Sequence, residues 1–492
     1  MDTSPNRQAS DEIELKLEID PQDAGKLPIP PDARTREQTT IYYDTADQAL
    51  RRHGYTLRVR GADGSFVQTI KPVTASAGLV SRPEFEQKVS SIQPDRSRPS
   101  GTPLDDLPLD ELEQVMRSLV RRTSWIIEVG GSRIQADLDE GEMTADGRTR
   151  RFDELELELL DGEPICLLAA GRSIADRVPV RLGVLTKAER GDRLASGAYK
   201  KIFKAAPVKV DRSMTVAEAF EVMVHACLKH YRLNEPLVIN KRKLEALHQT
   251  RVAMRRLRSA FTLFKSAIAD VEYQFLREEL RWFTSQLGDA RNLDVYLLRE
   301  LPQAERDLLL ERRELAYDHV LAVMNSRRGR SLMLELVGWT AFGPWRHGKQ
   351  ARAPVAHYAA GRLDRLWRSI AQAGHHIADL DEEARHELRI QVKKMRYAIE
   401  FLRGLYPQSV PEEKRFAAAV EELQESLGKL NDLATARTLI ESSTTDDSWL
   451  IGGSEGRVHL RESERAFQDL KAVGPFWKSS KAALPKGQLE RA

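Results

Sequence analysis

Residues 12–18 read Glu12-Ile-Glu-Leu-Lys-Leu-Glu18, so charged and aliphatic side chains alternate along the whole stretch. Successive side chains of a β-strand point to opposite faces of a sheet, so the alternation predicts a strand with one charged face. Residues 154–159, Glu154-Leu-Glu-Leu-Glu-Leu159, repeat the pattern. A solvated polar face is the common explanation, but carboxylates gathered from separate strands are also what a cation site needs.

The same alternation recurs in other stretches of the first 200 residues. The residues that share these charged faces are Arg58 with Arg60, Arg82 with Glu84, Glu86 and Lys88, and Asp137 with Asp139. Arginine binds phosphate oxygens bidentately, and carboxylates suit a hard divalent cation such as Mg²⁺ or Mn²⁺. A sheet of this kind, closed into a barrel with a polar lumen, would hold a polyanion and its metal for phosphoryl transfer.

The composition is that of a multidomain protein with ample core. The chain has 492 residues, 41% hydrophobic and 30% charged, and a formal net charge of +2, which excludes a chain that is basic throughout. Two cysteines, Cys166 and Cys227, are too few for a disulfide scaffold or a Cys-based zinc module. Residues 1–20 lack the apolar core of a signal peptide, and no stretch reaches the roughly 20 apolar residues of a membrane span. We therefore expect a cytoplasmic protein without a membrane partner.

The pattern changes near residue 205, after which Gly and Pro become sparse and Leu, Ala, Arg and Glu take helical spacing. Thr215 and Glu218 match a capping box that opens a helix. The predicted segments are a polar N-terminus (1–10), a strand-rich domain (11–204), a linker (205–213), a helical domain (214–480) and a tail (481–492).

The helical part contains an internal repeat. The motif that begins at His248 recurs 138 residues later at His386, and Leu287-Gly-Asp recurs 140 residues later as Leu427-Gly-Lys. The repeated basic positions are His248, Arg251, Arg255, Arg256 and Arg258 in the first copy and His386, Arg389, Lys393, Lys394 and Arg396 in the second. The repeat predicts two related helical halves, at about 214–350 and 351–480.

Each copy of the repeat places its basic residues on one side of a helix. Arg251, Arg255 and Arg258 fall about 60°, 20° and 80° from His248, so the four share a face that Arg256 flanks. A single basic face is usually solvated, but recurrence of the whole set favours binding of a polyanion such as a phosphate chain. Nucleic acid is disfavoured because few aromatic residues that could stack on bases lie beside these helices.

Residues 10–204 resemble the CYTH domain, the family of triphosphate tunnel metalloenzymes. The resemblance rests on Glu12-Ile-Glu-Leu-Lys16, Tyr43-Asp-Thr45, Leu57-Arg-Val-Arg60, Lys71, the Arg82-x-Glu84-x-Glu86 stretch, Arg133, Asp139 with Gly141, Glu156-Leu-Glu158 and Lys187-Ala-Glu-Arg-Gly191. It implies an eight-stranded antiparallel tunnel barrel that hydrolyses or cyclises triphosphate compounds with Mg²⁺ or Mn²⁺.

The resemblance also implies roles for individual residues. The implied metal ligands are Glu12, Glu14, Asp139, Glu156 and Glu158. The implied phosphate clamp consists of Lys16, Arg58, Arg60, Lys71, Arg82, Arg133 and Lys187. We place Glu12, Glu14, Lys16 and Lys187 in the catalytic group, and we expect Glu154 to support the site from the same face.

Residues 214–480 resemble the CHAD domain, through the repeated motifs given above. That resemblance implies two pseudo-symmetric helical bundles around a basic central cavity that binds inorganic polyphosphate, with the ten repeated basic residues as its contacts. Asp294 corresponds to Ala434 in the second half, so the halves are not equivalent here. We expect Asp289, Asp294 and Asp432 to orient arginines rather than to bind metal.

Together these patterns predict an α+β multidomain protein, a tunnel barrel followed by an all-α domain. Its predicted activity is metal-dependent hydrolysis of inorganic triphosphate to pyrophosphate and phosphate, with polyphosphate bound by the helices. Three alternatives stay open: an adenylate cyclase, an organic triphosphatase for thiamine triphosphate or a nucleotide, and a non-catalytic polyphosphate-binding protein. The preferred metal, the oligomeric state and an association with polyphosphate granules also stay open.

Overall fold

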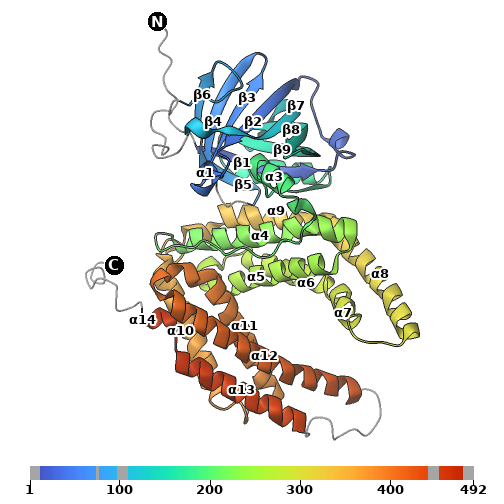
Figure 1. The fold of residues 1–492 in the computed structure, drawn as a ribbon, viewed down its shortest axis with the longest axis vertical. Helices are drawn as coiled ribbons and strands as arrows, with labels where there is room; N and C mark the ends of the chain where they lie inside the picture. Colours follow the sequence, from blue (N-terminus) through green and yellow to red (C-terminus); the bar gives the residue numbers. More distant parts are fainter. Residues whose placement is uncertain (1–10, 74–76, 97–108, 442–453, 480–492) are drawn as a thin grey trace. The chain divides into compact units, whose positions relative to one another are not determined.

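The computed structural model describes residues 11–73, 77–96, 109–441 and 454–479, without the side chains of residues 11–12, 80–82, 110, 431–441, 454–455 and 479 (Figure 1). The chain forms two compact units. The first contains residues 1–206, 224–255 and 271–343, and the second contains residues 207–223, 256–270 and 344–492.

The first unit is built on an antiparallel sheet, which has ten strands within the described residues. The strands are β1 (Asp11–Ile19), β2 (Arg34–Asp44), β3 (Tyr55–Ala62), β4 (Ser65–Pro72), β5 (Leu79–Pro83), β6 (Phe85–Val89), β7 (Glu113–Val129), β8 (Ser132–Ala145), β9 (Arg148–Asp161) and β10 (Val180–Leu182). Their order is β10-β1-β9-β8-β7-β2-β3-β4-β6, and β5 pairs with β1.

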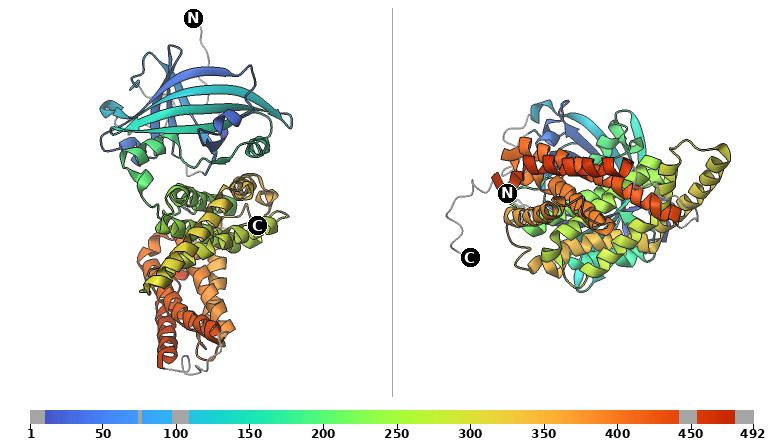
Figure 2. Two further views of the ribbon diagram at one scale, coloured as in Figure 1. Left: turned by 90° about the vertical axis from the view of Figure 1, so that its right-hand side faces the viewer. Right: turned by 90° about the horizontal axis from the view of Figure 1, so that it is seen from below.

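Strands β5 and β6 bring the two sides of this sheet together. β5 pairs with β1, β6 pairs with β4, and Glu84 alone separates the two strands. Pro83 has no N–H to donate to a ladder, so the strand is interrupted there. The sheet therefore curls into a tunnel without one continuous ladder around it, as the turned view shows (Figure 2).

The predicted N-terminal antiparallel tunnel domain is confirmed. The described residues form ten strands where eight were predicted, because the interrupted segment counts as β5 and β6 and because β10 adds a three-residue strand beside β1. The alternation sets the faces as expected, since Leu15 and Leu17 of β1 and Leu155 and Leu157 of β9 are buried in the core. Their charged neighbours consequently point into the tunnel.

Short helices cover the sheet, and longer ones form the helical part of the first unit. The short helices are α1 (Ala49–Arg52), α2 (Ile165–Ala175) and α3 (Lys187–Ala195). The longer ones are α4 (Val216–Lys241), α5 (Leu244–Ile268), α6 (Tyr273–Gln286), α7 (Gly288–Tyr296), α8 (Gln303–Asn325) and α9 (Arg327–Phe342), and α4 and α5 extend into the second unit. Gly338 of α9 lies so close to Leu168 of α2 that a Cβ there would collide with it. Within the first unit, α9 is thus packed closely against α2, which covers the sheet.

The second unit is mainly a stack of antiparallel helices. These are α10 (Val355–Gly374), α11 (Glu382–Leu402), α12 (Val410–Glu441), α13 (Ser454–Val473) and α14 (Phe476–Ser479), and each of α10 to α13 packs on the next (Figure 1). The aromatic side chains of Phe416, Phe467 and Trp477 are fully buried among them, and Trp477 Nε1 donates to Asp364 Oδ1 at 2.8 Å. None of the helices in the described part of the chain is long and apolar enough to cross a membrane.

The repeat seen in the sequence has a structural counterpart. A Cβ built on Gly288 would lie 3.6 Å from Arg251 Nη1, and one built on Gly428 would lie 3.8 Å from Arg389 Nη2. In both halves, therefore, the arginine that follows the histidine by three residues lies against the glycine of the Leu-Gly motif. The halves differ locally, since α7 begins at Gly288 whereas Gly428 lies inside the continuous helix α12.

Candidate active site

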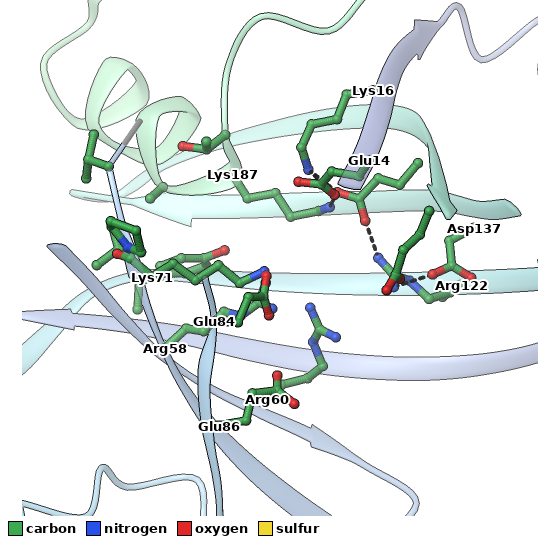
Figure 3. Close-up of a pocket in the computed structure, with 18 of the residues that line it drawn as sticks. Glu14, Lys16, Arg58, Arg60, Lys71, Glu84, Glu86, Arg122, Asp137 and Lys187 are labelled. Atoms are coloured by element: carbon green, nitrogen blue, oxygen red, sulfur yellow. Dashed lines mark hydrogen bonds and ion pairs between the residues drawn. The ribbon is translucent and has the colours of Figure 1, made fainter. Parts of the chain in front are cut away.

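A cavity of about 230 Å³ lies inside the curled sheet (Figure 3). Charged side chains from most of the strands and from α3 line it. The described cationic residues are Lys16, Arg36, Arg58, Arg60, Lys71, Arg122 and Lys187, and the acidic ones are Glu14, Glu84, Glu86, Asp137, Glu156 and Glu158. Charges removed from water need partners, so the pairing of these groups defines the site.

Glu156 on β9 is the centre of the ion pairs on one wall. Its Oε1 accepts hydrogen bonds from Lys16 Nζ at 2.6 Å and Lys187 Nζ at 2.8 Å, and its Oε2 accepts one from Arg122 Nη2 at 2.8 Å. Burial alone would raise the pKa of Glu156, but these three cations lower it well below its ordinary range. Glu156 is therefore an ionised carboxylate inside the tunnel.

Arg122 on β7 is a site residue that the sequence analysis missed. Its Nε and Nη2 donate to Asp139 at 2.6 and 2.7 Å, and its Nη1 donates to Asp137 at 2.7 Å. The neighbouring Arg121 points outward and is exposed. Because the two arginines are adjacent, the local sequence does not show which of them faces the tunnel. The β7–β8 register, which places Arg122 opposite Asp139, would have identified it.

Lys187 enters the tunnel from the first residue of α3. Thr186 and Glu189 form a capping box there, with Thr186 N donating to Glu189 Oε2 at 2.9 Å. Lys187 Nζ lies 2.9 Å from Asp139, 3.0 Å from Glu154 and 2.8 Å from Glu156. Burial tends to lower the pKa of Lys187, but the carboxylates raise it well above its ordinary value. Lys187 is thus a fixed positive charge.

The facing wall of the tunnel is cationic. Arg58 and Arg60 project from β3 and Lys71 from β4, where Lys71 pairs with Glu84 (Figure 3). The neighbouring Arg58 guanidinium, together with burial, lowers the pKa of Arg60 to about 10. Like charges held side by side favour an anionic ligand between them, so this wall suits phosphate oxygens.

The structure brings most of the predicted tunnel residues together. Those that line the one cavity are Glu14, Lys16, Arg58, Arg60, Lys71, Glu156, Glu158 and Lys187. Asp139 is 1% exposed and lies behind Arg122 and Lys187 rather than at the cavity surface. Glu154 pairs with Lys187 behind the wall, which is the supporting place expected for it.

Three of the predicted tunnel residues are not among the described residues that line the cavity. Arg133 is exposed and does not line the cavity, because the β8–β9 register shifts between Arg133 and Ile134 and ends the inward alternation there. The backbones of Glu12 and Arg82 stand opposite each other on β1 and β5, but their side chains lie outside the described residues.

The acidic residues are of the type that holds a hard divalent cation. Glu14 on β1 stands directly opposite Glu158 on β9, and both line the cavity. Opposed like charges are destabilising without a cation nearby, and carboxylate oxygens suit Mg²⁺ or Mn²⁺. Within the part of the chain that the structure describes, no three His, Cys, Asp or Glu side chains are grouped as a metal site. The carboxylate oxygens of the cavity are suitable ligands for such a cation. In the structure, Lys16 and Arg122 donate hydrogen bonds to the oxygens of Glu156.

The first basic face of the helical region lies on α5. Arg251 Nη1 donates to the carbonyl oxygen of Thr284 on α6 at 3.3 Å, while Arg255 is exposed. Burial and the positive charge of Arg291 are the main causes that lower the pKa of His248 below 6.5. His248 is therefore neutral at neutral pH.

The second basic face lies on α11, and the two copies of the fourth repeated position differ. Arg256 is 1% exposed, pairs with Glu400 at 2.7 Å and lies over the Phe401 ring, so it presents no cation at the surface. Its counterpart Lys394 lines a cavity of about 240 Å³ with Arg362 and other residues.

The acidic residues of the helical motifs also have defined partners. Asp294 is buried, and its two oxygens accept hydrogen bonds from Arg313 Nε and Tyr317 OH, each at 2.8 Å. Asp294 therefore orients an arginine in the structure. The side chain of Asp432 lies outside the described residues.

The fold and site so far define a charge-lined antiparallel tunnel joined to a basic helical repeat. Residues 10–191 match the CYTH domain family, and residues 222–441 match the CHAD domain family. The chain thus contains a CYTH domain followed by a CHAD domain, as the motifs predicted.

Individual proteins show the same likeness. An inorganic triphosphatase of Haemophilus influenzae is 29% identical over 197 residues, which cover 38% of this chain and 56% of that protein. The chain thus spans about half the length of this curated relative. The CHAD domain of the plant Ricinus communis is 26% identical with a TM-score of 0.44, covering 57% of this chain and 97% of that one. A putative adenylyl cyclase from Hippeastrum with dominant triphosphatase activity is 21% identical with a TM-score of 0.29, covering 38% and 96%.

Proposed function

We propose that the tunnel hydrolyses inorganic triphosphate to pyrophosphate and phosphate, with Mg²⁺ or Mn²⁺ as the cofactor. The observation that carries this proposal is the cavity itself, where a cationic wall faces a wall of paired carboxylates. The CYTH match and the triphosphatase of Haemophilus influenzae support it.

The lining also favours an inorganic substrate over a nucleotide or thiamine triphosphate. Among the described lining residues, Tyr42 is the one aromatic side chain, and Pro72 and Val73 are the largest other apolar ones. A base or a vitamin ring would need stacking or apolar contacts that this charged surface does not offer.

The residues divide into phosphate-binding and metal-binding groups. Arg58, Arg60 and Lys71 would bind phosphate oxygens and orient the chain of phosphates. Glu14, Glu156 and Glu158 would hold the divalent cation, which supplies charge neutralisation and lowers the pKa of a bound water.

The hydrolytic step needs no protein nucleophile. A water oxygen attacks the terminal phosphorus in line, the bond from that phosphorus to the bridging oxygen breaks, and pyrophosphate leaves. A tunnel carboxylate, which we assign to Glu14, accepts the proton from the water and passes it to solvent. Lys16 and Lys187 offset negative charge that develops on the phosphate oxygens.

Phosphate release from tripolyphosphate, with ATP in parallel, tests the proposal. We expect release in Mg²⁺ or Mn²⁺ that exceeds release from ATP, that stops with chelator and that is lost in Glu156→Gln. Release from ATP alone would favour an organic triphosphatase, and conversion of ATP to a cyclic product would favour the cyclase. Binding of tripolyphosphate without turnover would favour the non-catalytic alternative.

We further propose that the CHAD domain binds inorganic polyphosphate. Its support is the repeated basic residues on α5 and α11, with Arg256 excepted because it is buried and paired. Binding of long-chain polyphosphate that weakens steeply with added salt is the expected result, because the contacts are ionic.

A further inference from the structure

A chain of largely buried ion pairs leads from the tunnel to helix α4 of the CHAD domain. Lys187 Nζ lies 3.0 Å from Glu154 Oε1, and Glu154 Oε2 accepts a hydrogen bond from Arg190 Nη2 at 2.8 Å. Arg190 Nη2 also donates to Glu18 Oε1 at 3.0 Å, and Glu18 Oε2 accepts from Arg232 Nη2 at 2.7 Å. Glu154 is 0% and Arg232 4% exposed, while the Glu18 side chain between Arg190 and Arg232 is 27% exposed.

Helix α4 makes further contacts beside the same wall. Lys229 Nζ pairs with Glu189 of α3. The Glu189 side chain also completes the capping box with Thr186, the residue directly before Lys187. Arg232 Nε donates to the carbonyl oxygen of Leu182 at the end of β10, at 2.8 Å. One face of α4 therefore holds the start of α3 and one end of the ion-pair chain.

The chain is sensitive to loss of its last member. Burial alone would raise the pKa of Glu18, but Arg190 and Arg232 hold it below its ordinary value. Without Arg232, Glu18 keeps Arg190 as its guanidinium partner and draws it away from Glu154. Glu235, another partner of Arg232, keeps a hydrogen bond from Arg181 at 2.6 Å. Loss of Arg232 should therefore shift Arg190 and Glu154, and with them Lys187.

We propose that Arg232 and Lys229 are positioning residues for the tunnel, which hold Lys187 in place through the Glu18–Arg190–Glu154 chain and through Glu189. The inference rests on the proposed triphosphatase function for its kinetic test. It makes the first helix of the CHAD domain a support for the tunnel wall from behind. A barrel cut after residue 204 would lack that support even for short substrates.

The kinetic test compares Arg232→Gln, Glu18→Gln and the double variant on tripolyphosphate. We expect kcat to fall about tenfold or more in each single variant, because a displaced catalytic group loses its alignment. KM should change less than about twofold, since Arg58 and Arg60 on the other wall still bind phosphate. The double variant should be no slower than the slower single one, because both changes break the same link. Arg232→Lys should restore part of kcat.

A control variant separates the positioning of Lys187 from a general loosening of the contacts between the sheet domain and the helices. Arg172 Nε of α2 donates to Glu335 of α9 at 2.7 Å, so Arg172→Gln breaks an ion pair between the same two parts of the unit, outside the chain. We expect its kcat to equal that of the wild type. Wild-type kcat in Arg232→Gln, or effects of Arg232→Gln and Glu18→Gln that multiply in the double variant, would overturn the proposal.

A second measurement does not depend on activity. Amide hydrogen exchange of residues 187–195 should accelerate in Arg232→Gln and in Lys229→Met, but not in Arg172→Gln, while β8 and β9 stay protected. A wild type that turns over no triphosphate would refute the proposed function and leave this exchange result standing. Unchanged exchange of these amides in both α4 variants would refute the positioning role.

Discussion

Replacement of Arg122 by methionine should destabilise the tunnel more than any surface charge deletion. The side chain bonds to Asp137, Asp139 and Glu156, all away from water. Removing one partner of a buried ion pair typically costs about 3–5 kcal/mol, because the remaining charge is left unpaired. Arg122→Met removes the cation shared by three carboxylates, so the cost should fall within this range.

The remaining contacts place the expected loss at the lower end. Lys187 still faces Asp139 and Glu156, and Ser124 Oγ still donates to Asp137 at 2.6 Å. Each of the three carboxylates thus keeps at least one partner. We expect the free energy of opening of β8 and β9 to fall by about 3 kcal/mol.

Native-state hydrogen exchange of the β8 and β9 amides measures this free energy directly. The matched control is Arg121→Met, whose side chain is 60% exposed and pairs with Glu140 at the surface, where a loss below about 1 kcal/mol is expected. Adding Asp139→Asn to Arg122→Met should recover part of the loss, because it removes an underpaired carboxylate. Equal losses in Arg122→Met and Arg121→Met would refute the reasoning.

Three further predictions test the two domains. Glu14→Gln should abolish phosphate release while the thermal midpoint changes little, because it removes a proposed metal ligand; retained release would take Glu14 out of the site. Arg255→Glu with Lys393→Glu should weaken long-chain polyphosphate binding, most at low salt, and equal affinity for the variant at fixed salt would count against the basic faces. NMR titration should give His248 of the free protein a pKa below 6.5, and added polyphosphate should raise that pKa because the anion offsets its cationic neighbours. By linkage, binding should then tighten as the pH falls, and a pKa unmoved by polyphosphate would contradict a contact at His248.

Local patterns predicted the walls of the tunnel, and long-range register decided the rest. The alternation in β1 and β9 fixed both the strands and the faces, because a period of two is visible within seven residues. Arg122 escaped notice because its role depends on standing opposite Asp139 in another strand. Helical spacing assigned Arg256 to a basic face, but the side chain is buried and pairs with Glu400. Nothing near Arg256 in the sequence indicates that partner.

The charge balance of the cavity is consistent with the proposal that triphosphate and metal bind together. Seven cationic and six acidic side chains line it among the described residues, so its net charge is far smaller than that of a triphosphate. In the proposed site, a bare triphosphate would meet the carboxylates of Glu14 and Glu158, and a bare divalent cation would compete with Lys16 for Glu156. If both bound, Lys16 would be free to turn to a phosphate oxygen while Glu14 and Glu156 held the cation. Each ligand would then favour the other by the same factor, so the two affinities would rise together.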